Sequence, residues 1–224
     1  SQRRGEETKE RILEEACRVF AEKGFRDATH AEICRRAGVN IAAINYYFSS
    51  KDNLYHDAFE YLTEKAELLY PLDSGLPAST PALERLRLFI RTFLARAFDM
   101  ERLGNLRRIM MYEMLEPTGL LTGGMEKRLA KDRRYLLGML REIAGPEMPQ
   151  RTLEWCEMSL IGQCFMTMRG PGAEDRGPRK IFGLHASAME ALVDHILAFS
   201  LGGIAAVRTN PTPEQPRRAR KNRG

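Results

Sequence analysis

The sequence of 224 residues predicts an all-α protein. Apolar residues recur every three to four positions in one segment after another, which is the period of an amphipathic helix. Proline- and glycine-rich stretches such as "YPLDSGLPASTP" and "GPGAEDRGPRK" separate these segments, and no segment alternates apolar and polar residues as a β-strand does. The longer predicted helices span residues 52–70, 80–99, 102–115, 124–144, 148–169 and 184–205.

Shorter helices with clear start and stop signals precede them. The first spans residues 8–23, with Thr8 as its N-cap and Gly24 as its C-terminal stop. Thr29 is followed three residues later by Glu32, which is the spacing of a capping box. A second helix is therefore predicted to begin after Thr29.

A turn with the sequence "AGVN" joins this second helix to a third at residues 41–48. Gly38 can take the positive φ that the corner requires, and Asn40 can cap the third helix. Ile44 and Phe48, four residues apart, form its buried pair. Two short helices joined in this way predict a helix-turn-helix, in which the second helix reads DNA.

The outward positions of this reading helix match what a major groove offers. Small or apolar side chains can contact thymine methyl groups, and asparagine can pair bidentately with adenine. Hydroxyls, an ammonium group and helix N-terminal amides can hold phosphate oxygens. Taken alone, each residue is better explained without DNA, the tyrosines as half-buried spacers and Lys51 as a solvated side chain. The predicted DNA-binding residues are Thr29, His30, Asn40, Ile41, Ala42, Ala43, Asn45, Tyr46, Tyr47 and Lys51.

The net charge of +5 is concentrated at the C-terminal end. Residues 208–224 hold six Arg or Lys and one Glu, so the rest of the chain is neutral. This segment is rich in proline and arginine and almost lacks apolar residues, which predicts a disordered basic tail. Basicity of the whole chain is therefore no evidence that its folded part binds nucleic acid.

Cysteine usage and apolar run lengths bear on location. Cys17, Cys34, Cys156 and Cys164 fall singly within apolar helical patterns, which favours reduced structural thiols and a cytoplasmic protein. The opening residues "SQRRGEETKE" do not resemble a signal peptide. The longest uncharged apolar stretch near the end, residues 196–207, has 12 residues, fewer than the ~18 of a membrane span. We expect no membrane partner.

Residues 8–54 resemble the N-terminal DNA-binding domain of TetR-family transcriptional regulators. The likeness lies in a first helix ending in "FAEKGF", in Thr29 with "EI" three residues on, in "AGV", in a Tyr-Phe pair, and in Ser-Lys-acid before Leu54. The segments "AAINYYF", "MMYEMLEPT" and "HILAFSLGGIAAVR" are similar to the subgroup with a CerR/CecR-type C-terminal domain. Asn45 departs from the pattern, since many members carry tyrosine there.

This resemblance implies a helix-turn-helix domain at residues 1–54, a helical regulatory and dimerisation domain at 55–207, and the basic tail at 208–224. It also implies a homodimeric repressor that leaves a palindromic operator when a small-molecule effector binds. Carried over by position, Asn40, Ala42, Ala43 and Asn45 face the bases, and Thr29, Tyr46, Tyr47 and Lys51 contact phosphates.

In the family, the last two long helices pair with those of a second chain in a four-helix bundle. The corresponding segments here contain small residues that allow close helix approach and apolar residues that supply area. A dimer is also needed because one reading helix contacts too few base pairs, whereas two heads about 34–36 Å apart reach successive major grooves. The predicted interface residues are Ser159, Gly162, Phe165, Ala188, Leu192, Ile196 and Phe199.

The effector pocket is harder to place from sequence. Eleven methionines and a single tryptophan indicate an adaptable apolar lining, although each such residue is more often part of an ordinary core. The histidines lack i, i+4 spacing, so neither a metal nor a cofactor is expected. The predicted pocket residues are Phe89, Phe93, Met111, Met114, Trp155 and Gln163.

Two other functional classes are open to the same sequence. A sequence-tolerant architectural DNA-binding protein would use the tail arginines, with steep salt dependence and no base discrimination. An enzyme fits worst, because the sequence has no glycine-rich phosphate loop, no nucleophile elbow and no cluster of catalytic side chains. The leading hypothesis is a ligand-responsive, sequence-specific DNA-binding dimer.

Overall fold

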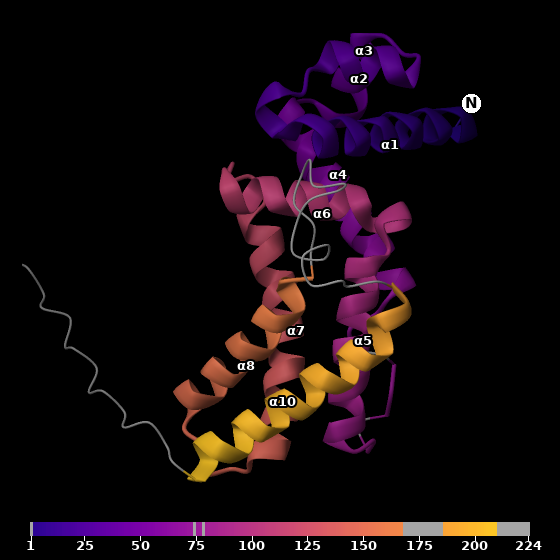
Figure 1. Cartoon of the computed structure of the whole chain (residues 1–224). Helices are drawn as coiled ribbons and strands as arrows, with labels where there is room; N and C mark the ends of the chain where they lie inside the picture. Colours follow the sequence, from indigo (N-terminus) through magenta and orange to yellow (C-terminus); the bar gives the residue numbers. More distant parts are fainter. Residues whose placement is uncertain (1, 74, 78, 168–185, 210–224) are drawn as a thin grey trace, which may run out of the picture.

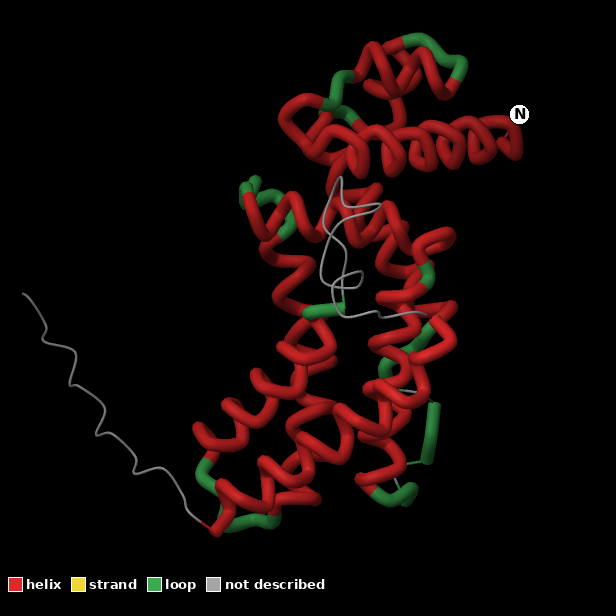
Figure 2. The backbone as a smooth tube through the Cα atoms, viewed as in Figure 1, coloured by secondary structure: helices red, strands yellow, loops and turns green. Residues whose placement is uncertain are grey.

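The structure, a computed structural model, describes residues 2–73, 75–77, 79–167 and 186–209. These residues form helices and no strand, which confirms the predicted all-α class (Figure 2). The helices are α1 (Gln2–Asp27), α2 (His30–Ala37), α3 (Ile41–Phe48), α4 (Lys51–Leu69), α5 (Ala82–Phe98), α6 (Met100–Leu115), α7 (Thr122–Ala144), α8 (Gln150–Phe165) and α10 (Met189–Thr209), the last preceded by a 3-10 turn at Ala186–Ala188.

Helices α1 to α3 form a head at one end of the molecule, and α4 leads from it into a larger helical body (Figure 1). The head has its own apolar centre, to which α1 contributes Phe20, α2 contributes Ile33 and α3 contributes Ile44, all fully buried. Phe48 is buried as well, so the predicted buried pair of the reading helix is confirmed. These two anchors fix which face of α3 is left to solvent.

The first helix differs from the prediction at its start. It begins at Gln2 rather than after Thr8, and the Thr8 hydroxyl donates to the Arg4 carbonyl oxygen at 2.8 Å inside the helix. Its predicted stop is confirmed, because Gly24 has φ 74° and ψ 176°, a conformation open essentially to glycine alone. A Cβ at Gly24 would also lie 3.1 Å from the Tyr112 ring on α6. The break in α1 therefore permits close packing of α6 on the head.

The described residues form two apolar clusters, whose limits differ from the predicted domain boundary at residue 54. Helix α4 runs unbroken through residue 54. Leu103 and Ile109 of α6 belong to the cluster of the head, together with Phe59 of α4. The other cluster joins α5, α7, α8 and α10. Helices α4 and α6 thus pack against the head, so a movement of either helix can be passed on to it.

The C-terminal helix ends later than predicted, because α10 continues through Arg208 to Thr209. The remainder of the predicted tail lies outside the described residues. By length and composition alone, α10 is long and apolar enough to cross a membrane, but a helix of a soluble protein can meet the same criterion. Most of α10 is not buried within the protomer. It thus leaves a large apolar surface uncovered.

None of the four cysteines forms a disulfide. Cys17 and Cys164 are buried, and burial raises the pKa of each thiol to about 12. Such thiols are packing residues that stay protonated at neutral pH. This agrees with the structural role predicted from their positions in apolar helical patterns.

Candidate DNA-binding surface and regulatory sites

Side-chain caps fix the geometry of the helix-turn-helix. Thr29 Oγ1 accepts a hydrogen bond from the Glu32 amide at 3.2 Å, and Asn40 Oδ1 accepts one from the Ala43 amide at 3.1 Å. Gly38 takes the left-handed conformation, with φ 64° and ψ 37°. The caps and the turn are thus those predicted from local sequence. Both capping side chains keep a donor for another partner, a hydroxyl proton on Thr29 and an amide NH₂ group on Asn40.

Ion pairs hold α2 against α1. The Glu32 carboxylate accepts from Lys23 Nζ at 2.5 Å and from Arg36 Nη2 at 2.8 Å. Arg36 also contacts Glu22 of α1 at 2.6 Å, and its hydrogen bond lowers the pKa of the Glu22 carboxyl. The Glu32 side chain is therefore used between helices, and only the Thr29 half of the predicted capping box forms.

One edge of α3 is free for an external partner. Ile41 is 54% exposed and Tyr46 is 81% exposed, while Ala42 and Asn45 between them are also exposed. The Asn45 side chain makes no hydrogen bond within the described part of the chain. Ala43, in contrast, is half-buried against the core of the head. The exposed edge thus presents one amide group, two small or apolar side chains and one phenol.

Two predicted DNA-binding residues beside this edge, Lys51 and His30, are partly occupied by contacts within the protein. Lys51 Nζ donates to the Arg26 carbonyl oxygen at 3.2 Å and lies 4.5 Å from the centre of the Phe25 ring. His30 is half-buried, and its Nε2 is buried with no hydrogen-bond partner among the described residues. Thr29 is exposed. An ammonium group has three donors, so Lys51 retains capacity for a phosphate oxygen.

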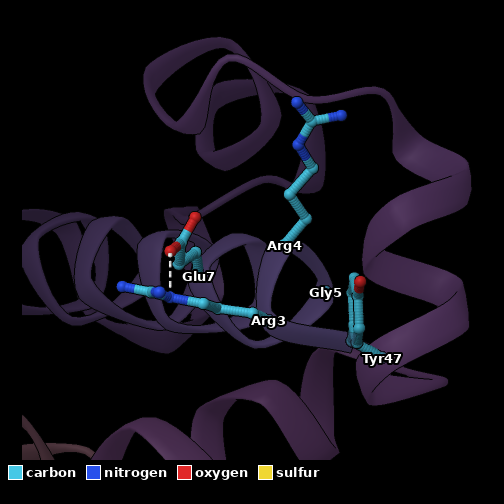
Figure 3. Close-up of a pocket in the computed structure, with 5 residues that line it drawn as sticks. All are labelled: Arg3, Arg4, Gly5, Glu7 and Tyr47. Atoms are coloured by element: carbon cyan, nitrogen blue, oxygen red, sulfur yellow. Dashed lines mark ion pairs between the residues drawn. The ribbon is translucent and has the colours of Figure 1, made fainter. Parts of the chain in front are cut away.

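A groove beside the reading helix contains residues that the sequence reasoning missed (Figure 3). It is lined by Arg3, Arg4, Gly5 and Glu7 of α1 and by Tyr47 of α3. Gly5 permits the approach, because a Cβ there would lie 3.3 Å from the Tyr47 hydroxyl. The available signal was "RRG" in the opening residues, which fell outside the predicted first helix.

The two arginines of this groove differ in their partners. Arg3 Nε pairs with Glu7 Oε1 at 3.5 Å, and Figure 3 shows Arg4 extending away from that pair. Arg4 makes no ion pair with any residue that the structure describes. Lys9, one turn further along α1, lies with its Nζ 5.7 Å from the centre of the Phe48 ring. Positive charge therefore flanks the C-terminal half of α3.

A second surface feature lies on α8 and α10, in the half of the molecule away from the head (Figure 1). A hollow of about 180 Å³ is lined by Trp155, Ser159 and Gln163 of α8 and by Phe199 of α10. Phe199 is 65% exposed. Trp155 and Gln163, predicted as pocket residues, thus lie on the outer surface beside predicted interface residues.

The predicted interface residues divide into three groups in the protomer. Ser159, Gly162 and Phe199 are exposed, and Phe165, Ala188 and Leu192 are half-buried. Ile196 is only 1% exposed, because it packs in the cluster that joins α10 to α5. Its place in that core leaves no surface for a second chain, which corrects the prediction for this residue.

A pocket of about 160 Å³, open to solvent on one side, lies among α4, α5, α6 and α7. None of the six predicted pocket residues lines it. Phe89 is buried between α5 and α7, with Phe93 6.3 Å away between ring centres, and Met114 is exposed. Met110 lines the pocket instead of Met111, since one helical position turns a side chain by about 100°.

A buried carboxylate joins α6 to the first turn of α4. The Tyr55 hydroxyl donates to Glu113 Oε1 at 2.8 Å, and Thr118 donates its amide to Oε2 at 3.1 Å and its hydroxyl to Oε1 at 2.8 Å. Burial, followed by the bond to Glu113, raises the pKa of Tyr55 above its usual range. Nearby, the Tyr112 hydroxyl donates to the Glu22 carbonyl oxygen at 3.1 Å. Head and body are therefore linked by polar as well as apolar contacts.

Two capped helices joined by a left-handed glycine, an exposed edge on the second of them and a helical body behind define a helix-turn-helix protein. Comparison with protein families agrees. Residues 12–58 match the model of bacterial regulatory proteins of the tetR family, and residues 82–204 match the C-terminal domain of the HTH-type transcriptional dual regulator CecR. The chain belongs to the TetR family of transcriptional regulators, with a CecR-type C-terminal domain.

Curated relatives are similar over parts of their length. The transcriptional regulator SrpR of Pseudomonas putida is 26% identical over 145 residues, which cover 64% of this chain and 65% of that protein. CecR of Shigella flexneri is 41% identical over 61 residues, which cover 27% of each chain. The chain thus spans less than two thirds of either relative.

Solved structures show the same fold. A TetR-like regulator from Rhodococcus sp. RHA1 aligns with a TM-score of 0.60 at 17% identity and covers 88% of this chain and 96% of that one. The fatty acid degradation regulator FadR from Bacillus halodurans aligns with a TM-score of 0.61 at 18% identity, over 88% and 95%. At such identities the likeness concerns the fold alone.

Proposed function

We propose that this protein is a homodimeric, sequence-specific repressor that binds a palindromic operator and is released by a small-molecule effector. The observation that carries the proposal is the free edge of α3. Its exposed side chains, Ile41, Ala42, Asn45 and Tyr46, stand on a helix whose opposite face is locked by buried residues. A rigid helix with an exposed amide and small side chains suits a major groove.

We assign the DNA contacts to side chains that are exposed or that keep a hydrogen-bond donor free for DNA. Asn45 and Ala42 face base edges, with Asn40 and Ala43 at the start of the helix. Tyr46, Tyr47 and Lys51 contact one phosphate backbone, and Thr29 contacts the other, with His30 and Ile41 beside them. To these we add Arg4, because it lines the groove together with Tyr47 and has no acidic partner among the described residues.

Arg4→Ala is expected to weaken binding to every duplex alike. A phosphate contact adds about 0.9 to the slope of log affinity against log salt, so losing Arg4 from both heads lowers that slope by roughly 1.8. Arg3→Ala is the matched control, since Arg3 is paired with Glu7. Fluorescence anisotropy over a salt series measures both variants. Equal slopes for the wild type and Arg4→Ala would exclude this contact.

The proposed dimer uses the α8 and α10 surface. Helix α10 exposes an apolar face, and Ser159 and Gly162 on α8 leave room for a second helix to approach. Pairing two copies through this surface buries Phe199 and Trp155 and leaves both heads at the other end of the molecule. Two reading helices can then reach successive major grooves, provided they stand about 34–36 Å apart.

The proposed switch runs from the pocket among α4, α5, α6 and α7 to the head. Helices α4 and α6 line that pocket and are joined by the Tyr55–Glu113 hydrogen bond. The same two helices meet the head, α4 through the Tyr55 ring against Phe20 of α1 and α6 through the Tyr112 hydroxyl, which donates to the Glu22 carbonyl oxygen. An effector that moves α6 relative to α4 therefore changes the orientation of the head. A coupling of about 1–3 kcal/mol gives a 5- to 150-fold change in operator affinity.

Tyr55→Phe is expected to lower the free energy of unfolding by about 1.5–3 kcal/mol, because it removes a donor from a buried carboxylate. Tyr112→Phe, which loses an exposed bond to a backbone carbonyl, should cost about 0.5–1.5 kcal/mol. Urea denaturation followed by circular dichroism compares the two. Equal losses would mean that the buried bond between α4 and α6 stabilises the protein no more than the exposed bond does.

The experiment that tests the proposed function removes residues 210–224, which hold most of the tail's positive charge and lie beyond α10. Anisotropy titrations then compare a preferred palindrome with a scrambled duplex of equal length. A sequence-specific repressor loses a modest amount of affinity and keeps its site preference. Loss of nearly all binding, with no preference before truncation, would instead indicate a sequence-tolerant architectural protein.

A further inference from the structure

The pocket among α4, α5, α6 and α7 combines an apolar lining with charged side chains at its open side. Its apolar lining comes from α4, α6 and α7, and its volume is about 160 Å³. An apolar cavity of about 150 Å³ in another protein holds benzene, so the volume of this pocket suits one aromatic ring. Two of the lining residues are flexible methionines, which adapt to aromatic rings. The apolar lining residues are Phe59, Ala66, Leu106, Met110, Met125 and Leu129.

The positive charges of the lining already have acidic partners. Arg96 Nη2 pairs with Glu67 at 2.8 Å, and its Nε donates to the Tyr70 carbonyl oxygen at 2.8 Å. Arg128 pairs with Glu60 at 2.7 Å. Lys131 pairs with Glu67 at 3.4 Å and with Asp73 at 3.6 Å. An anionic ligand would have to displace one of these carboxylates.

Asp132 on α7 is the exception among the charged lining residues. Its carboxylate is partly buried and makes no hydrogen bond or ion pair with any described residue. Burial raises its pKa, and the neighbouring Arg96 and Lys131, which lower it, are both held by Glu67. Counting the pairs above, the lining and its partners hold four carboxylates and three cations. This set of described residues therefore carries one carboxylate more than it has cations, and Asp132 is the one that forms no ion pair.

We infer that the effector is a small organic cation, whose apolar body fills this pocket and whose protonated nitrogen pairs with Asp132. The inference rests on the proposed function for the effector role and names the ligand class of that site. A cation recovers the interaction that a partly buried carboxylate loses with water, while an apolar group displaces no protein ion pair. A neutral ligand of the same shape gains only the apolar contacts, and an anion meets Asp132 unfavourably.

Three matched probes test this with the full chain: 2-phenylethylammonium, 2-phenylethanol and phenylacetate, titrated by isothermal calorimetry at one ionic strength. We expect the ammonium to bind at least tenfold more tightly than the alcohol, and phenylacetate to bind most weakly. Asp132→Asn should abolish the advantage of the ammonium and leave the affinity for the alcohol unchanged. Glu126→Gln, an equal change of charge at an exposed position of α7, should have no effect.

Leu129→Trp provides a second variant that does not touch the carboxylate. Leu129 lines the pocket and is itself exposed, so a larger side chain fills the space from its open side, and all probe binding should cease. Tightest binding of phenylacetate, equal affinities of the wild type and Asp132→Asn for the ammonium, or no binding of any probe would each overturn the inference. Ammonium binding that depends on Asp132 but leaves operator affinity unchanged supports the cation site and counts against the proposed effector switch.

Discussion

Phe199→Glu is expected to convert the dimer into a monomer. Phe199 is 65% exposed in the protomer, so the substitution should leave the fold of each chain intact. In a two-fold symmetric interface the residue occurs twice, and a central aromatic anchor contributes about 2 kcal/mol or more per copy. The dimer dissociation constant should therefore rise by roughly a thousandfold. Sedimentation velocity at micromolar concentration measures the change.

Operator binding should fall in parallel, because a monomer presents a single reading helix. The matched control is Leu68→Glu, which adds the same charge at an apolar residue of α4 that is 85% exposed. This control should remain dimeric and bind DNA normally. A wild-type chain that sediments as a monomer, or a Phe199→Glu variant that stays dimeric, would show that α8 and α10 do not form the interface.

Asn45→Ala is the second substitution with a large expected effect. A bidentate amide contact to adenine is worth about 1–3 kcal/mol of discrimination, and a dimer makes it in both half-sites. Affinity for the preferred palindrome should therefore fall by about 2–6 kcal/mol, while affinity for a scrambled duplex stays the same. The preference at one position of each half-site should relax, which anisotropy on single-base variants of the palindrome detects.

Lys51→Ala serves as the comparison for Asn45→Ala. A phosphate contact carries no sequence information, so its loss should weaken all duplexes alike and reduce the salt slope. Lys51 already donates a hydrogen bond to the Arg26 carbonyl oxygen, so its substitution should weaken DNA binding less than that of a lysine with no partner in the protein. If both substitutions act uniformly on all sequences, the assignment of Asn45 to a base is wrong.

The head could be predicted closely because its signals are local. The start of α2 follows from the Thr29 cap, the turn from Gly38, and the start of α3 from the Asn40 cap. The first turns of α1 escaped prediction, since "SQRRGEE" has no apolar periodicity. Their place in the structure includes a contact that no local pattern indicates, that between Gly5 and Tyr47 of α3.

The pocket could not be predicted, because it depends on how four helices pack. Asp132 differs from the other charged residues of the lining because Arg96 and Lys131 pair with Glu67 and not with Asp132. Glu67 lies far from Asp132 in sequence, so no local pattern indicates this. Aromatic and methionine content indicated an adaptable interior but not which positions face it. Phe89 thus proved to be a core residue between α5 and α7, and Trp155 a surface residue on α8.

The central claim is that the chain reads a specific DNA sequence as a dimer. Selection of binding sites from a pool of random duplex DNA with the full chain, followed by sequencing, tests it most directly. We expect enrichment of one palindrome whose half-sites are separated by about one helical turn or a multiple of it. Recovery of duplexes with no shared sequence, at affinities equal to that of the starting pool, would contradict the claim.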